Sequence, residues 1–149
     1  MLPMSRHVSE ELRRLVTDRA DHICEYCLIH EDDTFFGCEV DHVISLKHSG
    51  PTEGDNLAYA CTFCNRNKGS DVASLSPQTG ALVRLFNPRT DRWAEHFRLD
   101  GYRIEPVTSI GEATARILKF NDSERILERE TFVEMKRYPT KQALVRMSK

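Results

Sequence analysis

The sequence predicts an α+β fold in which a small zinc-stapled core, built as strand, loop, strand and helix, precedes a C-terminal α+β extension. Three observations lead to this prediction. Cys-x-x-Cys pairs occur at 24–27 and 61–64, a strand-like stretch at 36–46 lies between them, and hairpin and helix-start signals follow residue 71. For a chain of 149 residues we expect a core over 1–71 and an extension over 72–149 packed on or beside it.

The first half of the chain carries the signals of a helix, a hairpin and a second helix. Ser9 and the two glutamates after it form an N-cap signal, and a helical stripe runs from there to about Ala20. Apolar and β-branched residues predict a strand over 36–46, a polar loop over 50–55 and a return strand over 57–60. A helix then begins at residue 61 or 62 and ends at Lys68, because Gly69 stops it.

The second half begins with a turn-rich connection at 74–80 and a strand at 82–86. Strands are expected over 93–99 and 102–107, because the dipeptide Asp100-Gly101 between them favours a tight hairpin. The stretch 109–112 has the form of a capping box and predicts a helix to about Phe120. Asp122 or Ser123 begins a further helix that runs to about Arg137.

The composition is that of a soluble globular protein, with 40% hydrophobic and 30% charged residues. No apolar run approaches the ~20 residues that a membrane helix needs, and the first residues lack the apolar segment of a secretory signal. We therefore expect a cytoplasmic protein with reduced thiols and no membrane partner. The net charge of −2 is unevenly spread, since 24–71 holds nine acidic and three basic residues and 72–149 holds ten and fourteen. The extension is thus the more favourable face for nucleic acid.

The paired cysteines supply a complete tetrahedral set of soft ligands for a structural zinc: Cys24, Cys27, Cys61 and Cys64. Two disulfides or unrelated core thiols are the alternatives, and a reducing compartment disfavours the disulfides. Cys38 stands outside the pairs, and we expect it to be a buried strand residue rather than a fifth ligand or a reactive thiol.

A second group of side chains, Asp41, His42, Asn56 and Asn65, offers oxygen and nitrogen atoms suited to a hard cation and to a proton transfer. An Asp-His pair alone is weak evidence, because such a pair on a strand is often only hydrogen-bonded at the surface. Its spacing from the cysteines favours a catalytic site over a zinc-stapled binding module with unused polar groups.

The order of these residues resembles the HNH endonuclease family, in the zinc-stapled branch that has a Cys-x-x-Cys pair on either side of the active-site hairpin. The resemblance implies a ββα-metal (His-Me finger) core and a metal-dependent endonuclease. It also implies that Asp41 binds the metal, His42 is the general base, Asn56 braces the loop and Asn65 is the second metal ligand. The letters HNH stand for three active-site residues of the family, and the third position is Asn65 here rather than His. Family members with Asn at this position resemble the branch that uses magnesium. The implied cofactors are therefore a structural Zn²⁺ and a catalytic Mg²⁺ or Mn²⁺.

The resemblance implies hydrolysis of phosphodiester bonds in nucleic acid, with DNA favoured over RNA and nicking as the elementary reaction. A double-strand break would need a dimer, a second domain or repeated action, and a protein partner or a homodimer is possible. Three cations near the expected metal, Lys47, Arg66 and Lys68, are candidates to hold phosphates, although a solvated helix face explains each nearly as well. The rival function is a catalytically silent zinc module that binds DNA or a protein, and a third is an RNA-directed toxin nuclease.

Arginines and aromatic residues alternate in the extension, which suits contact with a nucleic-acid backbone and stacking on bases. Packing of the aromatic residues in the core is an equally good interpretation. The arginines are Arg84, Arg89, Arg92, Arg98 and Arg103. His96 lies between aromatic residues, so packing or a DNA contact is expected of it rather than metal binding.

Overall fold

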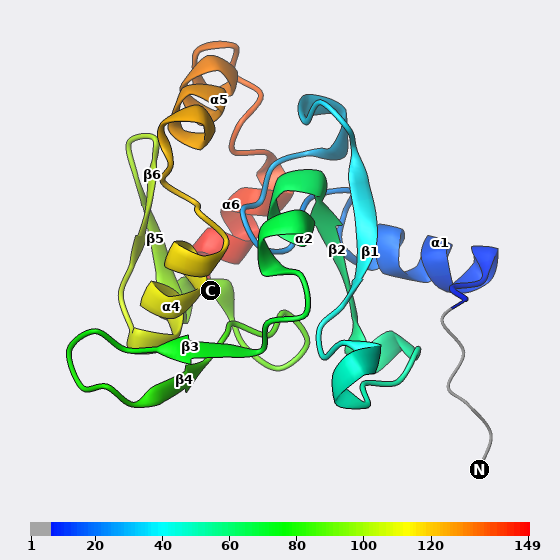
Figure 1. Cartoon of the computed structure of the whole chain (residues 1–149). Helices are drawn as coiled ribbons and strands as arrows, with labels where there is room; N and C mark the ends of the chain where they lie inside the picture. Colours follow the sequence, from blue (N-terminus) through cyan, green and yellow to red (C-terminus); the bar gives the residue numbers. More distant parts are fainter. Residues whose placement is uncertain (1–6) are drawn as a thin grey trace.

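The computed structural model describes residues 7–149, so the first six residues of the predicted core lie outside the described part. The first group of elements is α1 (Glu10–Arg19), β1 (Cys38–His42), β2 (Leu57–Cys61) and α2 (Thr62–Lys68), with short 3-10 turns at Glu31–Asp33, Leu46–His48 and Gly54–Asn56. The second group is β3 (Ala73–Leu75), β4 (Leu82–Arg84), α3 (Trp93–His96), β5 (Phe97–Asp100), β6 (Arg103–Pro106), α4 (Ser109–Ile117), α5 (Ser123–Glu134) and α6 (Lys141–Ser148). The strands form three antiparallel pairs, and the fold is mixed, as predicted (Figure 1).

The hairpin of β1 and β2 is the centre of the first group, with α1 and α2 on either side of it (Figure 1). The strand β1 is shorter than the predicted 36–46. It ends at His42 because the N–H and C=O of Ile44 both bond to the side chain of Asn56 instead of a neighbouring strand. The return strand β2 lies within one residue of its prediction and is buried throughout.

The predicted helix ends of the first group are confirmed. Ser9 caps α1, since its Oγ accepts a hydrogen bond from the N–H of Leu12 at 3.1 Å. The cap of α2 is Cys61, whose sulfur lies 3.5 Å from the backbone nitrogen of Cys64. Gly69 ends α2 with φ at +52°, a backbone conformation that favours glycine.

The extension departs from its predicted elements in several places. Residues 93–96 form a helical turn rather than the start of a strand, because Trp93 and His96 are three residues apart and both turn into the core. The hairpin of β5 and β6 pairs Asp100 with Arg103, so its turn lies one residue later than predicted. The cap of α4 is Thr108, whose Oγ1 accepts from the N–H of Gly111 at 3.0 Å, and this helix ends at residue 117 rather than 120.

Two elements of the extension were absent from the sequence prediction. The strand β3 lies in the segment expected to be only a turn-rich connection, and it pairs with β4, which ends at Arg84 rather than Phe86. Helix α6 begins after Thr140, whose Oγ1 accepts from the N–H of Ala143 at 3.0 Å. Only Ala143 of α6 is fully buried, and the cap residue Thr140 is the start signal that the sequence prediction missed. Within residues 7–149 no helix is long and apolar enough to cross a membrane.

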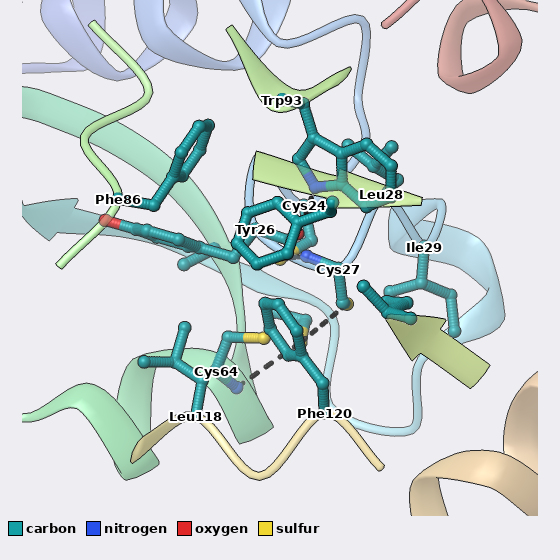
Figure 2. Packing of buried hydrophobic residues seen from close by; sticks show 14 of the residues in the cluster. Cys24, Tyr26, Cys27, Leu28, Ile29, Cys64, Phe86, Trp93, Leu118 and Phe120 are labelled. Atoms are coloured by element: carbon teal, nitrogen blue, oxygen red, sulfur yellow. Dashed lines mark hydrogen bonds between the residues drawn. The ribbon is translucent and has the colours of Figure 1, made fainter. Parts of the chain in front are cut away.

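The two groups share one hydrophobic core. Figure 2 shows Phe86, Trp93 and Phe120 of the extension packed around Tyr26 and Cys27. In residues 24–29, here called the first knuckle, two main-chain carbonyls accept hydrogen bonds from side chains of the extension. The Trp93 indole N–H donates to the carbonyl of Tyr26 at 2.8 Å, and the hydroxyl of Tyr138 donates to the carbonyl of Cys27 at 3.0 Å. The extension therefore packs directly on the part of the chain that carries the first cysteine pair.

Candidate active site and metal centre

The four paired cysteines come together in one buried cluster. Their sulfur atoms all lie within 4.8 Å of one another, and the side chains are at most 1% exposed. Every cysteine of the described chain is a free thiol, so the disulfide alternative does not hold. Four thiolates at this spacing suit a tetrahedral zinc, as the sequence predicted. Cys38 lies outside the cluster, on β1, and is only partly buried.

An arginine from the extension lies against this cluster. Nη2 of Arg125 is 3.1 Å from the sulfur of Cys27 and 3.8 Å from that of Cys61, and Nη1 is 3.8 Å from the sulfur of Cys64. The Arg125 side chain is 4% exposed, and its Nε donates to Glu128 at 3.2 Å. Four thiolates around one Zn²⁺ carry a net charge of about −2, so a buried cation beside them offsets part of that charge.

The cluster favours at least one thiolate even before a metal is considered. Burial alone would raise the pKa of the Cys27 thiol. Hydrogen bonds from the other three thiols and the positive charge of Arg125 instead hold the pKa of Cys27 well below its ordinary value. Thiolates are the form that binds zinc, and Arg125 favours this form at Cys27, whereas burial raises the pKa of Cys24 and of Cys64 well above its ordinary value.

A second site lies on the β1 and α2 side of the hairpin. It is an open hollow, here called the polar depression, lined by Val40, Asp41, His42, Ser45, Leu46, Lys47, Asn65, Gly69 and Ser70. Four of the residues singled out in the sequence thus lie around one hollow: Asp41, His42, Lys47 and Asn65. Asn56, Arg66 and Lys68 are outside this lining.

The carboxylate of Asp41 is buried, with only 4% of its side chain exposed. The hydroxyl of Tyr26 donates to Oδ2 at 2.8 Å, and Nζ of Lys68 lies 3.2 Å from Oδ2 and 3.3 Å from Oδ1. Burial raises the pKa of Asp41, while the charge of Lys68 and the hydrogen bonds from Tyr26 and Lys68 act in the opposite direction.

The position of Lys68 differs from the expected phosphate contact. Its side chain is 2% exposed, and Nζ also donates to the main-chain carbonyl of His42 at 3.1 Å. The reason is geometric, because α2 follows β2 directly and its last turn packs back on β1. Lys68 therefore balances the charge of Asp41 inside the protein. Lys47 and Arg66 are exposed, and Lys47 lines the polar depression.

His42 is partly exposed at the end of β1, and Nε2 of its ring lies 2.9 Å from Oγ1 of Thr52 in the following loop. Burial lowers the pKa of His42, and the charge of Lys68 lowers it further, while Asp41 acts to raise it. The net effect is a pKa below the ordinary value. The imidazole is therefore neutral at neutral pH and able to accept a proton.

The side chain of Asn56 is hydrogen-bonded to the loop between the two strands. Its Oδ1 accepts from the N–H of Ile44 at 2.9 Å, and its Nδ2 donates to the carbonyls of Ile44 at 2.8 Å and Pro51 at 2.9 Å. The same loop needs a glycine at position 50, because a Cβ there would lie 1.7 Å from the carbonyl oxygen of Ile44. These contacts fix the loop that carries Thr52 beside His42.

The side chain of Asn65 faces the polar depression from α2. Its Nδ2 donates to Oε2 of Glu39 at 2.6 Å, which leaves Oδ1 as the oxygen available to a cation. Sequence reasoning missed Glu39, although its place two residues before Asp41 puts it on the same face of β1. Tyr26 and Thr52 were also missed, and no pattern signals them, because folding alone brings them to Asp41 and His42.

Most arginines of the extension that the sequence pointed to are paired with acidic residues. Arg89 forms a buried ion pair with Glu25 of the first knuckle. The exposed pairs are Arg84 with Asp91, Arg92 with Glu95, and Arg103 with Glu105. The aromatic residues between them are largely core, and so is His96, which is 8% exposed and packs on Phe86 and Phe97.

Comparison with known proteins agrees with this geometry. Residues 24–71 match the family model described as HNH endonuclease. No curated protein and no solved structure matches the chain. The matched segment begins at the first cysteine of the cluster and includes the whole lining of the polar depression. Helix α1 and the extension lie outside it.

Proposed function

We propose, from the match of residues 24–71 to the HNH endonuclease family model, that the protein is a metal-dependent endonuclease whose elementary reaction is nicking of DNA. The observation that supports the proposal best is the convergence of Asp41, His42 and Asn65 on one open depression. The proposed nucleophile is water rather than a ribose 2′-hydroxyl, so the reaction works on DNA. The five free cysteines suit a reducing compartment, and we propose that the protein is cytoplasmic.

The donor atoms around the polar depression fit a hard divalent cation such as Mg²⁺ or Mn²⁺. Asp41 offers a carboxylate. Asn65 offers its side-chain oxygen Oδ1, because its nitrogen Nδ2 is the atom that contacts Glu39. Such a cation, when bound, neutralises charge on the phosphoryl oxygens and stabilises the leaving 3′-oxygen. The protein's own part is to hold Asp41 and Asn65 on neighbouring elements, β1 and α2, with the rest of the site open to water and substrate.

His42 is the proposed general base. Its lowered pKa keeps the imidazole neutral, and its contact with Thr52 engages Nε2. We assign Nδ1 as the atom that takes the proton from the attacking water. Asn56 moves no proton, and its role is to hold the loop so that Thr52 orients the ring. Lys47 and Arg66 are the exposed cations that would hold phosphates next to the scissile bond.

A catalytically silent zinc module is the second candidate. The observation in its favour is the ion pair of Asp41 with Lys68, since both carboxylate oxygens already have a cation near them. A silent module binds nucleic acid or a protein and leaves plasmid intact. An active enzyme converts supercoiled plasmid to the nicked form.

The test is incubation of zinc-loaded protein with supercoiled plasmid and Mg²⁺ or Mn²⁺, with structured RNA in a parallel reaction. We expect His42→Ala to lower the nicking rate roughly 10²–10⁴-fold with zinc content unchanged. His48→Ala is the matched control, because His48 is exposed and does not line the polar depression. A wild-type rate in His42→Ala contradicts the assigned base, and no cleavage by the wild type favours the silent module.

A further inference from the structure

We propose that Tyr26 positions Asp41 for metal binding and so joins the zinc cluster to the catalytic site. Tyr26 stands between the two cysteines of the first knuckle, yet its hydroxyl donates to Oδ2 of Asp41 at 2.8 Å. The inference rests on the proposed function, because it concerns the role of Asp41 as a metal ligand. Tyr26 itself does not line the polar depression, so it is a positioning residue.

The first knuckle holds Tyr26 rigidly. Cys24 and Cys27 on either side of it belong to the buried cluster (Figure 2). The Tyr26 side chain is 1% exposed. Its main-chain carbonyl accepts from the indole of Trp93, and its ring meets the ring of Phe86 edge-on at 6.4 Å between centroids. Because both the main chain and the ring of Tyr26 are held by these contacts, its hydroxyl has little freedom to move. The position of that hydroxyl therefore depends on the folded knuckle and, through the cysteines, on its zinc.

Asp41 needs such a partner because the torsion about its carboxylate group is soft. Nζ of Lys68 lies 3.2 Å from Oδ2 and donates a hydrogen bond to Oδ1 at 3.3 Å. Tyr26 contacts Oδ2 alone. The two donors thus hold one oxygen each, and the hydrogen bond from Tyr26 fixes the rotation of the carboxylate by holding Oδ2 on the interior side. Asp41 lines the polar depression, so we assign the carboxylate held in this orientation to the cation.

One consequence is that loss of zinc reaches the catalytic site by a short route. The route runs from the cysteines along the main chain to Tyr26, and from its hydroxyl to Asp41. Partners that orient a metal ligand commonly change metal affinity or activity roughly 10–100-fold when they are removed. We expect an effect of this size on the affinity of the polar depression for Mn²⁺ when the hydroxyl of Tyr26 is removed.

The experiment compares Tyr26→Phe with Tyr59→Phe in the zinc-loaded full chain. Both variants lose one hydroxyl that donates to a carboxylate, because Tyr59 donates to Glu31 at 3.2 Å. Free Mn²⁺ is titrated by electron paramagnetic resonance, and zinc content and melting temperature are measured alongside. Tyr26→Phe should need roughly 10–100-fold more Mn²⁺ for half-saturation while it keeps one zinc, and Tyr59→Phe should bind Mn²⁺ as the wild type does.

Asp41→Asn separates failure of this inference from failure of the proposed function. If Asp41→Asn loses Mn²⁺ and Tyr26→Phe binds it with wild-type affinity, Asp41 is a ligand but Tyr26 does not position it, and the inference is overturned. If Asp41→Asn binds Mn²⁺ as the wild type does, Asp41 is not a ligand, and both the metal assignment and the inference fail. Equal weakening in Tyr26→Phe and Tyr59→Phe also overturns the inference, because the effect is then not specific to the hydrogen bond with Asp41.

Discussion

The domain at 24–71, which matches the HNH endonuclease model, and the extension at 72–149 use their charged side chains in opposite ways. In the domain, polar groups line an open hollow, among them the exposed Lys47, and Arg66 is exposed on α2. In the extension several arginines turn inward. Arg89 pairs with Glu25 of the first knuckle, and Arg125 lies on the cysteine cluster. The number of basic residues in a segment therefore does not give its surface charge, because some of these residues are buried and paired inside the protein.

The comparison also changes how the extension relates to the domain. Trp93 and Tyr138 donate hydrogen bonds to the first knuckle, and Arg125 donates to its sulfur atoms. Side chains of the extension thus enclose the site at which zinc is expected. The extension supports the metal centre, and the domain supplies the polar depression. Four changes can break or sharpen this distinction, and they are given from the largest expected effect to the smallest.

Loss of zinc should unfold both regions together. Structural zinc contributes roughly 10–16 kcal/mol of apparent binding free energy, which matches or exceeds the net stability of about 5–15 kcal/mol of a typical domain. Cys61→Ser should therefore abolish the cooperative thermal transition seen by circular dichroism, and Cys38→Ser, outside the cluster, should keep it and one zinc. A separate, zinc-independent transition of the extension would show that the two regions do not share one core.

Lys68→Met should destabilise the folded protein by about 3–5 kcal/mol, because it leaves the buried carboxylate of Asp41 without its cation. Lys47→Met removes the same charge from an exposed position and should change stability by less than about 0.5 kcal/mol. Urea denaturation of the zinc-loaded proteins measures both. Equal stability of the two variants would mean that Lys68 is not buried against Asp41 in solution.

Arg125→Gln should weaken the hold on zinc while most of the fold survives. Hydrogen bonds to charged groups contribute roughly 1.5–3 kcal/mol, and Arg125 makes its closest one to Cys27 at 3.1 Å. The measurement is the rate of zinc transfer to a chromogenic chelator, and Arg98→Gln, exposed on β5, is the control. Identical rates of zinc transfer in the two variants would show that Arg125 of the extension does not help to hold the zinc.

The smallest effect concerns the affinity for nucleic acid. Composition alone predicts that the extension supplies it, but four of its five candidate arginines are paired with acids. We now expect Lys47→Gln with Arg66→Gln to lower the slope of log K against log salt by about 0.9 for each phosphate that is no longer neutralised. The variant with all five extension arginines changed to Gln should lower it less. Both sets of substitutions are made in the His42→Ala background, and the salt dependence of binding to a short duplex is measured for each. A larger decrease of the slope in the five-arginine variant would show that the extension is the main binding face.

Local patterns determined the parts of the fold that one segment can specify. Ser9 predicted the start of α1, Gly69 the end of α2, and the spacing of the cysteines predicted the zinc ligands. Spacing and resemblance together indicated Asp41, His42 and Asn65, which do line one depression. Elements with weak signals were missed or shifted. The cap of α4 is Thr108, one residue before the predicted start, and α6 was missed although Thr140 caps it.

Only the tertiary structure decided which side chains meet across the hairpin, the helices and the extension. Lys68 has the sequence pattern of a solvent-exposed helix residue, but the last turn of α2 packs on β1 and buries it beside Asp41. Tyr26 and Arg125 lie 15 and 98 residues from their partners Asp41 and Cys27. Sequence patterns report periodicity and local hydrogen bonding, over a few residues. A buried charge finds its counter-ion only where folding removes both from water, so its partner is a property of the packed core rather than of either segment.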